Sequence, residues 1–144
     1  MTLVVDASVV IKWLLQDPAR EAGTKYATAL MNVVTNAGAE VLQPFHWLAE
    51  ILAVLSRLSP GTAAADILRI QALELPTTDD PSVLKRACQL ATEHRTHAFD
   101  TLYHAVALGV PDGILITADT AYHRVARSAG RILLLDEWWN EEFP

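Results

Sequence analysis

Apolar residues along this chain fall into two kinds of pattern: short continuous runs, and longer stretches in which they recur every three or four positions. The continuous runs are typical of strands buried on both faces, whereas the spaced pattern is typical of helices with one buried side. The runs predict strands at 2–6, 41–42, 74–77, 113–117 and 131–135. The spacing predicts helices at 7–15, 18–37, 44–58, 62–73, 81–93, 96–107 and 119–128.

Prolines mark where several of these helices are expected to begin. Asp17-Pro18 and Asp80-Pro81 each place a residue that caps helices before a proline, which is favoured at the first helical position. Pro44 is expected to open a third helix in the same way.

Strands and helices alternate along the chain, and no tight Asn-Gly turn joins neighbouring strands into a hairpin. Alternation of this kind is the signature of a parallel sheet covered by helices on both faces. We therefore expect an α/β fold, a three-layer α/β/α sandwich around a central, mostly parallel sheet. The chain has 144 residues and no internal repeat, linker or low-complexity tract, which predicts one domain over 1–144.

The composition narrows the class of protein. Hydrophobic residues make up 51% of the chain, which argues against disorder. No segment approaches the roughly 20 uninterrupted apolar residues that a membrane span needs, and Asp6 and Lys12 interrupt the first apolar run, which lacks a secretory signature. We expect a cytoplasmic protein. The single cysteine, Cys88, excludes a disulfide framework and a multi-cysteine zinc site, and we expect it to be buried.

The net charge of −6 does not decide whether a nucleic acid is a partner. Four of the 17 acidic residues lie in the last nine positions, and without them 13 acids face 11 bases. If four further acids gather around a metal ion, nine acids and 11 bases remain for the rest of the surface. The overall charge therefore neither indicates nor excludes a polyanionic substrate.

Two aspartates come at the ends of predicted buried strands. Asp6 ends the run TLVVD, and Asp119 follows LITA. Ligands of open α/β sheets bind outside the carboxyl ends of the strands, so both carboxylates are expected at the ligand-binding edge. Either residue could instead only cap the helix that follows it, because Asp is favoured in that role.

Two further acids stand in largely apolar helices. Glu50 interrupts an apolar run and shares a helical stripe with His46 and Arg57, so this stripe faces either a cleft or solvent. Asp100, in HAFDTLYHAVAL, lies near a helix start, where a negative charge also interacts favourably with the helix dipole. Each acid alone is weak evidence for a site, and spacing alone does not show that they converge.

Four ionised carboxylates at one site would repel one another until some of them took up protons. A divalent cation removes that conflict, and ligation by oxygen alone suits the hard ions Mg²⁺ and Mn²⁺ better than Zn²⁺. Such an ion can activate water and stabilise a phosphoryl transition state. If the four acids converge, they would therefore form a metal-dependent phosphoryl-transfer site.

The order and surroundings of these acids resemble those of the PIN-domain nucleases, and within them most closely the VapC-type toxins of toxin–antitoxin pairs. The stretches that carry the resemblance are VVDASVVIKWL around Asp6, PFHWLAEILAVL around Glu50, FDTLYHAVAL around Asp100 and LITADTAYHRVA around Asp119. The likeness covers nearly the whole chain, and its most specific pieces are DASV and LITADTAYHRVA.

The resemblance implies an α/β/α sandwich and a Mg²⁺- or Mn²⁺-dependent endoribonuclease, the toxin of a type II toxin–antitoxin system. In such an enzyme Asp6 and Asp100 would hold the metal directly. Glu50 and Asp119 would complete its shell, partly through water, and orient the hydroxide that attacks phosphorus in line.

The resemblance also assigns supporting residues and partners. Ser8 and Thr117 match the family's hydroxyl positions and would orient carboxylates or metal-bound water. Local capping of the backbone is the alternative for both. The implied partners are an RNA substrate, a cognate antitoxin and a second copy in a homodimer. The predicted helices at 18–37 and 62–73 are expected to help bind both protein partners.

Four basic residues follow the strands that end in Asp6 and Asp119, and they are candidates for RNA phosphate contacts. They are Lys12, Arg20, Arg124 and Arg127. Ordinary solvated charge is the alternative for each of them. Contacts of this kind would make RNA affinity fall as salt is added.

Histidines and tryptophans fit packing better than chemistry. The five histidines show no HExxH-like pairing with an acid. His46 and His104 each lie one helical turn from a candidate acid and could touch substrate. Trp138 and Trp139 are expected to be core or interface anchors, and as a pair in an acidic tail they could rest in a partner's groove.

Two other phosphoryl-transfer folds also use aspartates at strand ends. Receiver domains carry an acidic pair near the first strand and a lysine after the last one, whereas Asp6 has no acidic neighbour and 131–135 reads RILLL. Haloacid-dehalogenase-like phosphatases carry DxD, where this chain has DAS. A catalytically silent PIN fold that binds RNA or protein is the remaining alternative, and the complete set of four acids argues against it.

Overall fold

The computed structural model describes residues 1–17, 19 and 21–142, and a four-stranded sheet lies at its centre. The strand order is β2 (Glu40–Val41), β1 (Thr2–Val5), β5 (Gly113–Thr117) and β6 (Ile132–Leu134). Each strand is parallel to its neighbours. The predicted α/β fold with a central parallel sheet is therefore confirmed.

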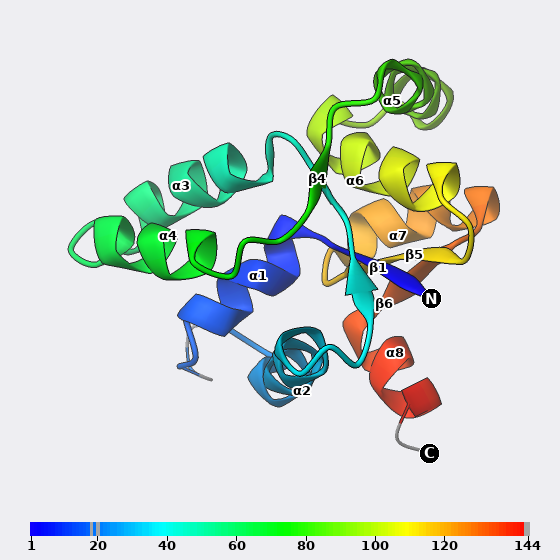
Figure 1. The fold of residues 1–144 in the computed structure, drawn as a ribbon. Helices are drawn as coiled ribbons and strands as arrows, with labels where there is room; N and C mark the ends of the chain where they lie inside the picture. Colours follow the sequence, from blue (N-terminus) through cyan, green and yellow to red (C-terminus); the bar gives the residue numbers. More distant parts are fainter. Residues whose placement is uncertain (18, 20, 143–144) are drawn as a thin grey trace.

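Helices cover both faces of this sheet. Their bounds are α1 (Ala7–Leu14), α2 (Thr24–Thr35), α3 (Trp47–Leu58), α4 (Ala63–Gln71), α5 (Pro81–His94), α6 (Ala98–Gly109), α7 (Thr120–Ala126), η1 (Arg127–Ala129) and α8 (Leu135–Glu142). In Figure 1, α5 and α6 lie on one side of the sheet and α2 and α8 on the other. The pair α3 and α4 extends beyond the end at which β1 meets α1 (Figure 1).

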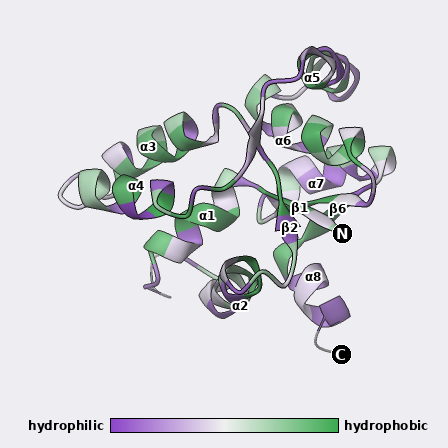
Figure 2. Cartoon of the chain, viewed as in Figure 1, coloured by the Kyte–Doolittle hydropathy of each residue, from purple (hydrophilic) through white to green (hydrophobic). Residues whose placement is uncertain are grey.

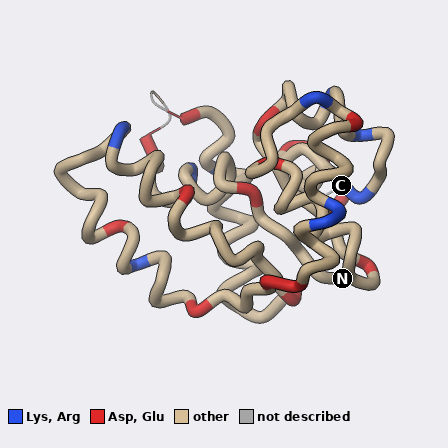
Figure 3. The backbone as a smooth tube through the Cα atoms, turned by 90° about the horizontal axis from the view of Figure 1, so that it is seen from above, with Lys and Arg blue, Asp and Glu red and all other residues tan. Residues whose placement is uncertain are grey.

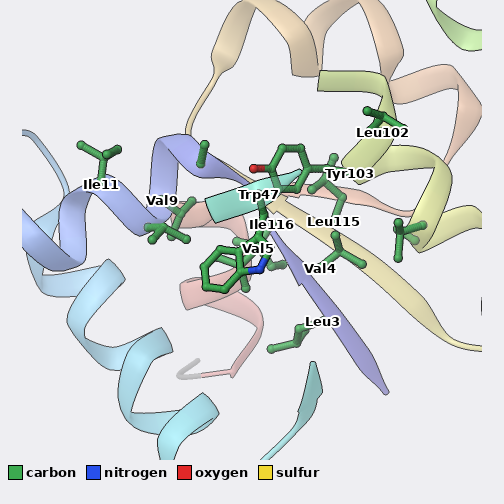
Figure 4. Close-up of a cluster of buried hydrophobic side chains, with 14 of the residues drawn as sticks. Leu3, Val4, Val5, Val9, Ile11, Trp47, Leu102, Tyr103, Leu115 and Ile116 are labelled. Carbon is green, nitrogen blue, oxygen red and sulfur yellow. The ribbon is translucent and has the colours of Figure 1, made fainter. Parts of the chain in front are cut away.

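The core forms around β1 and β5, which pair from Thr2 with Gly113 to Val5 with Ile116. The apolar side chains of β1 are completely buried, as parallel strands covered on both faces require. Figure 4 shows Val5 and Ile116 among the residues of this cluster. The helix α6, apolar along most of its length, packs on both strands, and the more hydrophilic α5 covers α6 from outside (Figure 2).

A second, two-stranded parallel sheet is formed by one strand before α3 and one strand after α4. It pairs β3 (Gln43–Pro44) with β4 (Thr77–Thr78). The prediction that Pro44 opens a helix is therefore wrong, and α3 begins at Trp47 instead. The backbone N–H groups on either side of Pro44 donate to Pro76 and Thr78, while proline, which has no N–H, occupies the position between them.

The helix predicted over 18–37 is shorter than expected, because α2 begins only at Thr24. Asp17 does cap the chain that follows it: its Oδ1 accepts a hydrogen bond of 2.9 Å from the backbone N–H of Ala19. That bond closes a turn rather than a helix, and Gly23, with left-handed backbone, leads into α2. Pro18 lies outside the described residues.

The acidic tail that carries the tryptophan pair forms α8. Trp138 is buried in the core of the protein, and the ring of Trp139 lies 5.3 Å from that of Tyr26 on α2. Both tryptophans therefore pack α8 against the rest of this chain. Cys88 is exposed on α5, contrary to expectation, because the inner face of that helix is formed by Ala87 and its neighbours one turn away.

None of the helices in the described part of the chain is long and apolar enough to cross a membrane.

Candidate active site

Asp6 and Asp119 lie at the same edge of the sheet. Asp6 directly follows β1, and its backbone N–H donates to the carbonyl of Ile116 on β5 at 3.0 Å. Asp119 comes two residues after the end of β5. Because β1 and β5 are adjacent and parallel, their carboxyl ends bring the two aspartates together.

Two hydroxyl groups hold the buried carboxylate of Asp6. Thr117 Oγ1 donates to Asp6 Oδ2 at 2.8 Å, and the Ser8 hydroxyl donates to the same oxygen. Oδ1 is left free of both. Asp6 occupies the N-cap position of α1, yet its side chain makes no capping hydrogen bond there, so helix capping does not explain this residue.

Burial raises the pKa of Asp6. The hydrogen bonds from Ser8 and Thr117 oppose that effect, while repulsion from Glu50 and Asp119 adds to it. The carboxylate is thus held in one orientation in an environment that disfavours its negative charge.

The hydroxyls of Ser8 and Thr117 also bind the backbone beyond β5. Ser8 Oγ accepts from the N–H of Ala118 at 2.9 Å, and Thr117 Oγ1 accepts from the N–H of Asp119 at 3.0 Å. Each hydroxyl therefore makes both kinds of contact that the sequence suggested: it donates to the Asp6 carboxylate and it accepts from a backbone N–H. Together these bonds tie the carboxyl ends of β1 and β5 to each other.

Asp119 caps the helix that follows it. Its Oδ1 accepts a hydrogen bond of 2.9 Å from the N–H of Tyr122, in the first turn of α7. This bond fixes the carboxylate at the sheet edge and involves only one of its oxygens. The capping alternative raised for both strand-end aspartates thus holds for Asp119 and fails for Asp6.

Glu50 reaches the same region from α3. Exposure rises along the helical stripe that it shares with His46 and Arg57: His46 is buried, Glu50 is partly buried, and Arg57 is exposed. His46 Nε2 lies 3.3 Å from Glu50 Oε2. That oxygen is buried. Burial, followed by the charge of Glu50, raises the pKa of Tyr103.

Asp100 enters from the first turn of α6. Burial raises the pKa of Asp100 to about 6, and repulsion from Asp6, Asp119 and Glu50 contributes to the rise. A carboxyl group responds to its neighbours in this way only when they lie close by in a poorly solvated region. The four acids, carried by four different elements, therefore form one electrostatic group.

A cavity of about 440 Å³ joins these side chains. Its lining includes all four acids predicted from the sequence, together with Ser8, Lys12 and Glu21. Thr117 is fully buried beneath it and acts through its contact with Asp6.

Glu21 and Gln43 were not expected at this site. Glu21, between α1 and α2, adds a fifth carboxylate to the cavity lining, and no periodic pattern in that segment signals it. Gln43 is fully buried, and its side-chain amide pairs with the backbone of Val5, with both hydrogen bonds at 2.8 Å. The Gln43 side chain thereby makes the two hydrogen bonds that a neighbouring strand would make to Val5, the residue immediately before Asp6.

The four candidate phosphate contacts differ in their positions. Lys12 lines the cavity, where its Nζ lies 2.8 Å from Glu21 Oε2. Arg124 and Arg127 are exposed and do not line it. Arg20 lies outside the described residues. Figure 3 shows Lys and Arg at several separate places along the backbone rather than in one stripe.

His104 has a structural role. It is fully buried, with Nδ1 3.0 Å from the Tyr122 hydroxyl and Nε2 2.7 Å from the carbonyl oxygen of Gly130. Burial lowers the pKa of His104, so the ring is neutral near pH 7. Packing, rather than contact with substrate, accounts for this residue.

The sequence of the chain matches the sequence model of one protein family. The model of the PIN domain matches residues 3–128, a span that includes all four acids. The chain belongs to the PIN-domain family. No curated protein matches it closely enough to count as a relative. PIN domains are generally metal-dependent nucleases and commonly use Mg²⁺ or Mn²⁺.

The donor set of this PIN domain fits such an ion. The four acids offer only oxygen, Glu50 Oε2 is buried, and burial together with repulsion from the other acids raises the pKa of Asp100. No three His, Cys, Asp or Glu side chains within the described ranges are arranged to hold a metal ion directly. Mg²⁺ usually keeps several waters and binds proteins through one or two carboxylates, so it does not require three such ligands.

Proposed function

We propose that this PIN domain is a Mg²⁺- or Mn²⁺-dependent endoribonuclease and the toxin of a type II toxin–antitoxin system. The observation that carries the proposal is that Asp6, Glu50, Asp100 and Asp119 line one cavity at the carboxyl edge of a parallel sheet. Burial, and after it repulsion from the other acids, raises the pKa of Asp6 and of Asp100, so a bound cation would offset the cost of their negative charge.

The surroundings of each acid suggest its role. Asp6 and Asp100 would hold the ion directly, with the Asp6 carboxylate kept in one orientation by Ser8 and Thr117. Glu50 and Asp119 would bind through water and orient the water that attacks phosphorus. When bound, the ion supplies positive charge at the non-bridging phosphate oxygens and makes that water more acidic.

Lys12 is placed to contact the RNA backbone within the cavity. Its ion pair with Glu21 is partly buried, so a phosphate group that binds Lys12 would have to displace that carboxylate. Arg124 and Arg127, on α7 and η1, would contact the strand farther from the cut. Affinity for RNA should then fall as salt is raised.

The toxin role is supported by the likeness to VapC-type proteins around each of the four acids. Such a toxin would bind a cognate antitoxin and form a homodimer. A cavity of about 450 Å³ between α1, α2 and α4 is lined in part by Met31, Ile70 and Leu73, and would accept apolar side chains of a partner. It lies in the region that the resemblance assigns to partner binding.

Cleavage of RNA in vitro tests the nuclease. The purified parent should cut single-stranded RNA with Mn²⁺ or Mg²⁺ and stop when EDTA is added. Asp100→Asn should lower the activity at least about 100-fold. Loss of a residue that only hydrogen-bonds a metal ligand usually costs up to that much, and Asp100 is proposed to be a ligand itself. Asp79→Asn, an exposed acid outside the cavity, is the control and should cut as the parent does. A parent inactive with both metals would favour a silent RNA- or protein-binding module.

Expression in a bacterial host tests the toxin role. The parent should arrest growth, and a folded Asp100→Asn protein at the same level should not. Arrest by both proteins would count against a nuclease as the cause. Coexpression with the cognate antitoxin should restore growth of cells that make the parent.

A further inference from the structure

Two phenylalanine rings stand exposed beside the acidic cavity. Phe45 is 54% exposed and Phe99 is 59% exposed. They are the only aromatic residues among the large exposed apolar side chains that the structure describes. Phe99 immediately precedes Asp100 on α6, and Phe45 lies just before α3, the helix that carries Glu50.

Both rings pack against the buried imidazole of His46. Phe99 stacks on it, with ring centroids 5.3 Å apart and planes 17° from parallel. Phe45 meets it edge-on at 5.8 Å, and Tyr103 does so at 5.2 Å. His46 is only 8% exposed, and its Nε2 lies 3.3 Å from Glu50 Oε2. The aromatic group therefore continues directly into the acidic site.

Contacts within the chain hold the two phenylalanines in place. The N–H of Phe45 donates to the carbonyl of Thr78 at 3.1 Å, which anchors it to the end of β4. Phe99 is held by the first turn of α6 and by its stack on His46. A ring that is already ordered loses little conformational freedom when a ligand stacks on it.

Proteins recognise single-stranded RNA by stacking unpaired bases on aromatic side chains. A phosphodiester held at the cavity carries nucleotides on either side, and one of them must pass over the cavity rim. Phe99 directly precedes Asp100, which lines the cavity, and its exposed ring offers an aromatic surface next to that acid. A protein interface would instead centre on a broad patch depleted of charge, whereas Asp100 and Glu50 border these rings.

We propose that Phe99, backed by His46 and flanked by Phe45, is the platform on which an unpaired base of the RNA stacks next to the phosphodiester that is cut. This rests on the proposed ribonuclease function and adds to it a residue of the same site that would contact a base. Phe99 is thereby a specificity-determining residue outside the set of acids.

The test compares Phe99→Leu, which keeps an apolar side chain but loses the aromatic face, with Phe99→Tyr, which keeps both. The substrate is a short fluorescent single-stranded RNA of mixed sequence, cut with Mn²⁺, and product lengths give the cut site. Phe99→Leu should lower kcat/KM roughly 5- to 100-fold, mainly by raising KM. Phe99→Tyr should have a kcat/KM close to that of the parent. Leu84→Ala, at an exposed apolar residue of α5, is the control and should match the parent.

A second series replaces each nucleotide around the cut site in turn by one that lacks its base. With the parent, removal of the base at one of these positions should lower kcat/KM about as much as Phe99→Leu does. With Phe99→Leu, removal of the same base should lower kcat/KM almost no further, because the aromatic ring on which that base stacks is already absent. The same strand annealed to its complement should be a poor substrate for the parent.

The outcomes separate the two proposals. A parent that cuts no RNA overturns the ribonuclease function and, with it, the platform. An active parent that Phe99→Leu matches, or losses that add independently in the base-deletion series, overturns the platform alone. Light scattering provides the other check: if Phe99→Leu is folded but changes from dimer to monomer, the ring belongs to a protein interface and the platform proposal is wrong.

Discussion

Thr117, the last residue of β5, donates a hydrogen bond of 2.8 Å to the carboxylate of Asp6, the first residue after β1. The bond joins two residues that are 111 positions apart in the sequence. It binds the same oxygen as the Ser8 hydroxyl and leaves Asp6 Oδ1 free of both. The fold thus fixes the orientation of a buried carboxylate by pairing two strand ends.

Thr117→Val keeps the shape of the side chain and removes its hydroxyl. We expect Mn²⁺ to bind roughly 10- to 100-fold more weakly, because the carboxylate of Asp6 loses a partner that orients it. Titration calorimetry with Mn²⁺ measures this. Thr92→Val is the control, since that hydroxyl bonds only within exposed α5 and should leave the affinity unchanged. Equal affinity in parent and Thr117→Val would show that the bond has no part in metal binding.

The raised pKa of Asp100 predicts how the stability of the metal-free protein depends on pH. At a pH between the usual 3.8 and about 6, Asp100 holds a proton in the folded state that it has lost in the unfolded state. Stability therefore falls as pH rises through this window, and the penalty is complete above it. Because solvent screens this half-buried group, we expect the effect to be about 1–2 kcal/mol.

Urea unfolding in EDTA at about pH 4 and at about pH 7 checks that prediction. Asp100→Asn should be stabilised relative to the parent at the higher pH and gain much less at the lower one. Asp6 also has a raised pKa, so a falling trend should persist in the variant, with a smaller slope. Adding Mg²⁺ at the higher pH should stabilise the parent more than the variant. A variant with the same pH dependence as the parent would show that Asp100 titrates normally.

Gln43→Met should destabilise the protein by about 2–4 kcal/mol. The amide of Gln43 satisfies both the N–H and the carbonyl of Val5, and each buried group left without a partner costs about 1–3 kcal/mol. Gln71→Met, at an exposed position of α4, should be nearly neutral in the same urea titration. If the two variants are equally stable, water or a shifted backbone replaces the Gln43 side chain.

Gly113 allows β5 to approach the end of α6. A Cβ atom there would lie 2.3 Å from the carbonyl oxygen of Ala107 and 2.6 Å from Val110 Cγ2. Gly113→Ala should therefore lower stability by about 1–3 kcal/mol, as overpacking of a close contact does. Gly61→Ala, with nothing within 4 Å of the added atom, should show no such loss by thermal unfolding. Equal melting temperatures would mean that α6 moves aside without cost.

The sequence predicts much of the sheet and of the acidic site for a physical reason. Fully buried parallel strands are continuous apolar runs, so the strands that end beside Asp6 and Asp119 can be read directly. Glu50 and Asp100 stand out as acids in apolar helices, but their spacing does not say which way they point. That follows only from the packing of α3 and α6 around the end of β1.

Other features depend on contacts that leave no pattern in the sequence. Gln43 replaces a strand with its side chain, and Glu21 reaches the cavity from an irregular segment, so neither has a periodic signal. The spacing of Leu135 and Trp138 is helical, yet the surrounding acids make α8 resemble a solvated tail. The exposure of Phe99 is also hidden, because an aromatic residue in an apolar helix is usually buried.

Diffraction from crystals soaked in Mn²⁺, recorded at a wavelength where manganese scatters anomalously, tests the central claim most directly. We predict an anomalous peak in the cavity bounded by the carboxylates of Asp6, Glu50, Asp100 and Asp119, and its loss in Asp6→Asn. An ion bound only elsewhere, or a peak in the cavity that survives Asp6→Asn unchanged, would contradict the account.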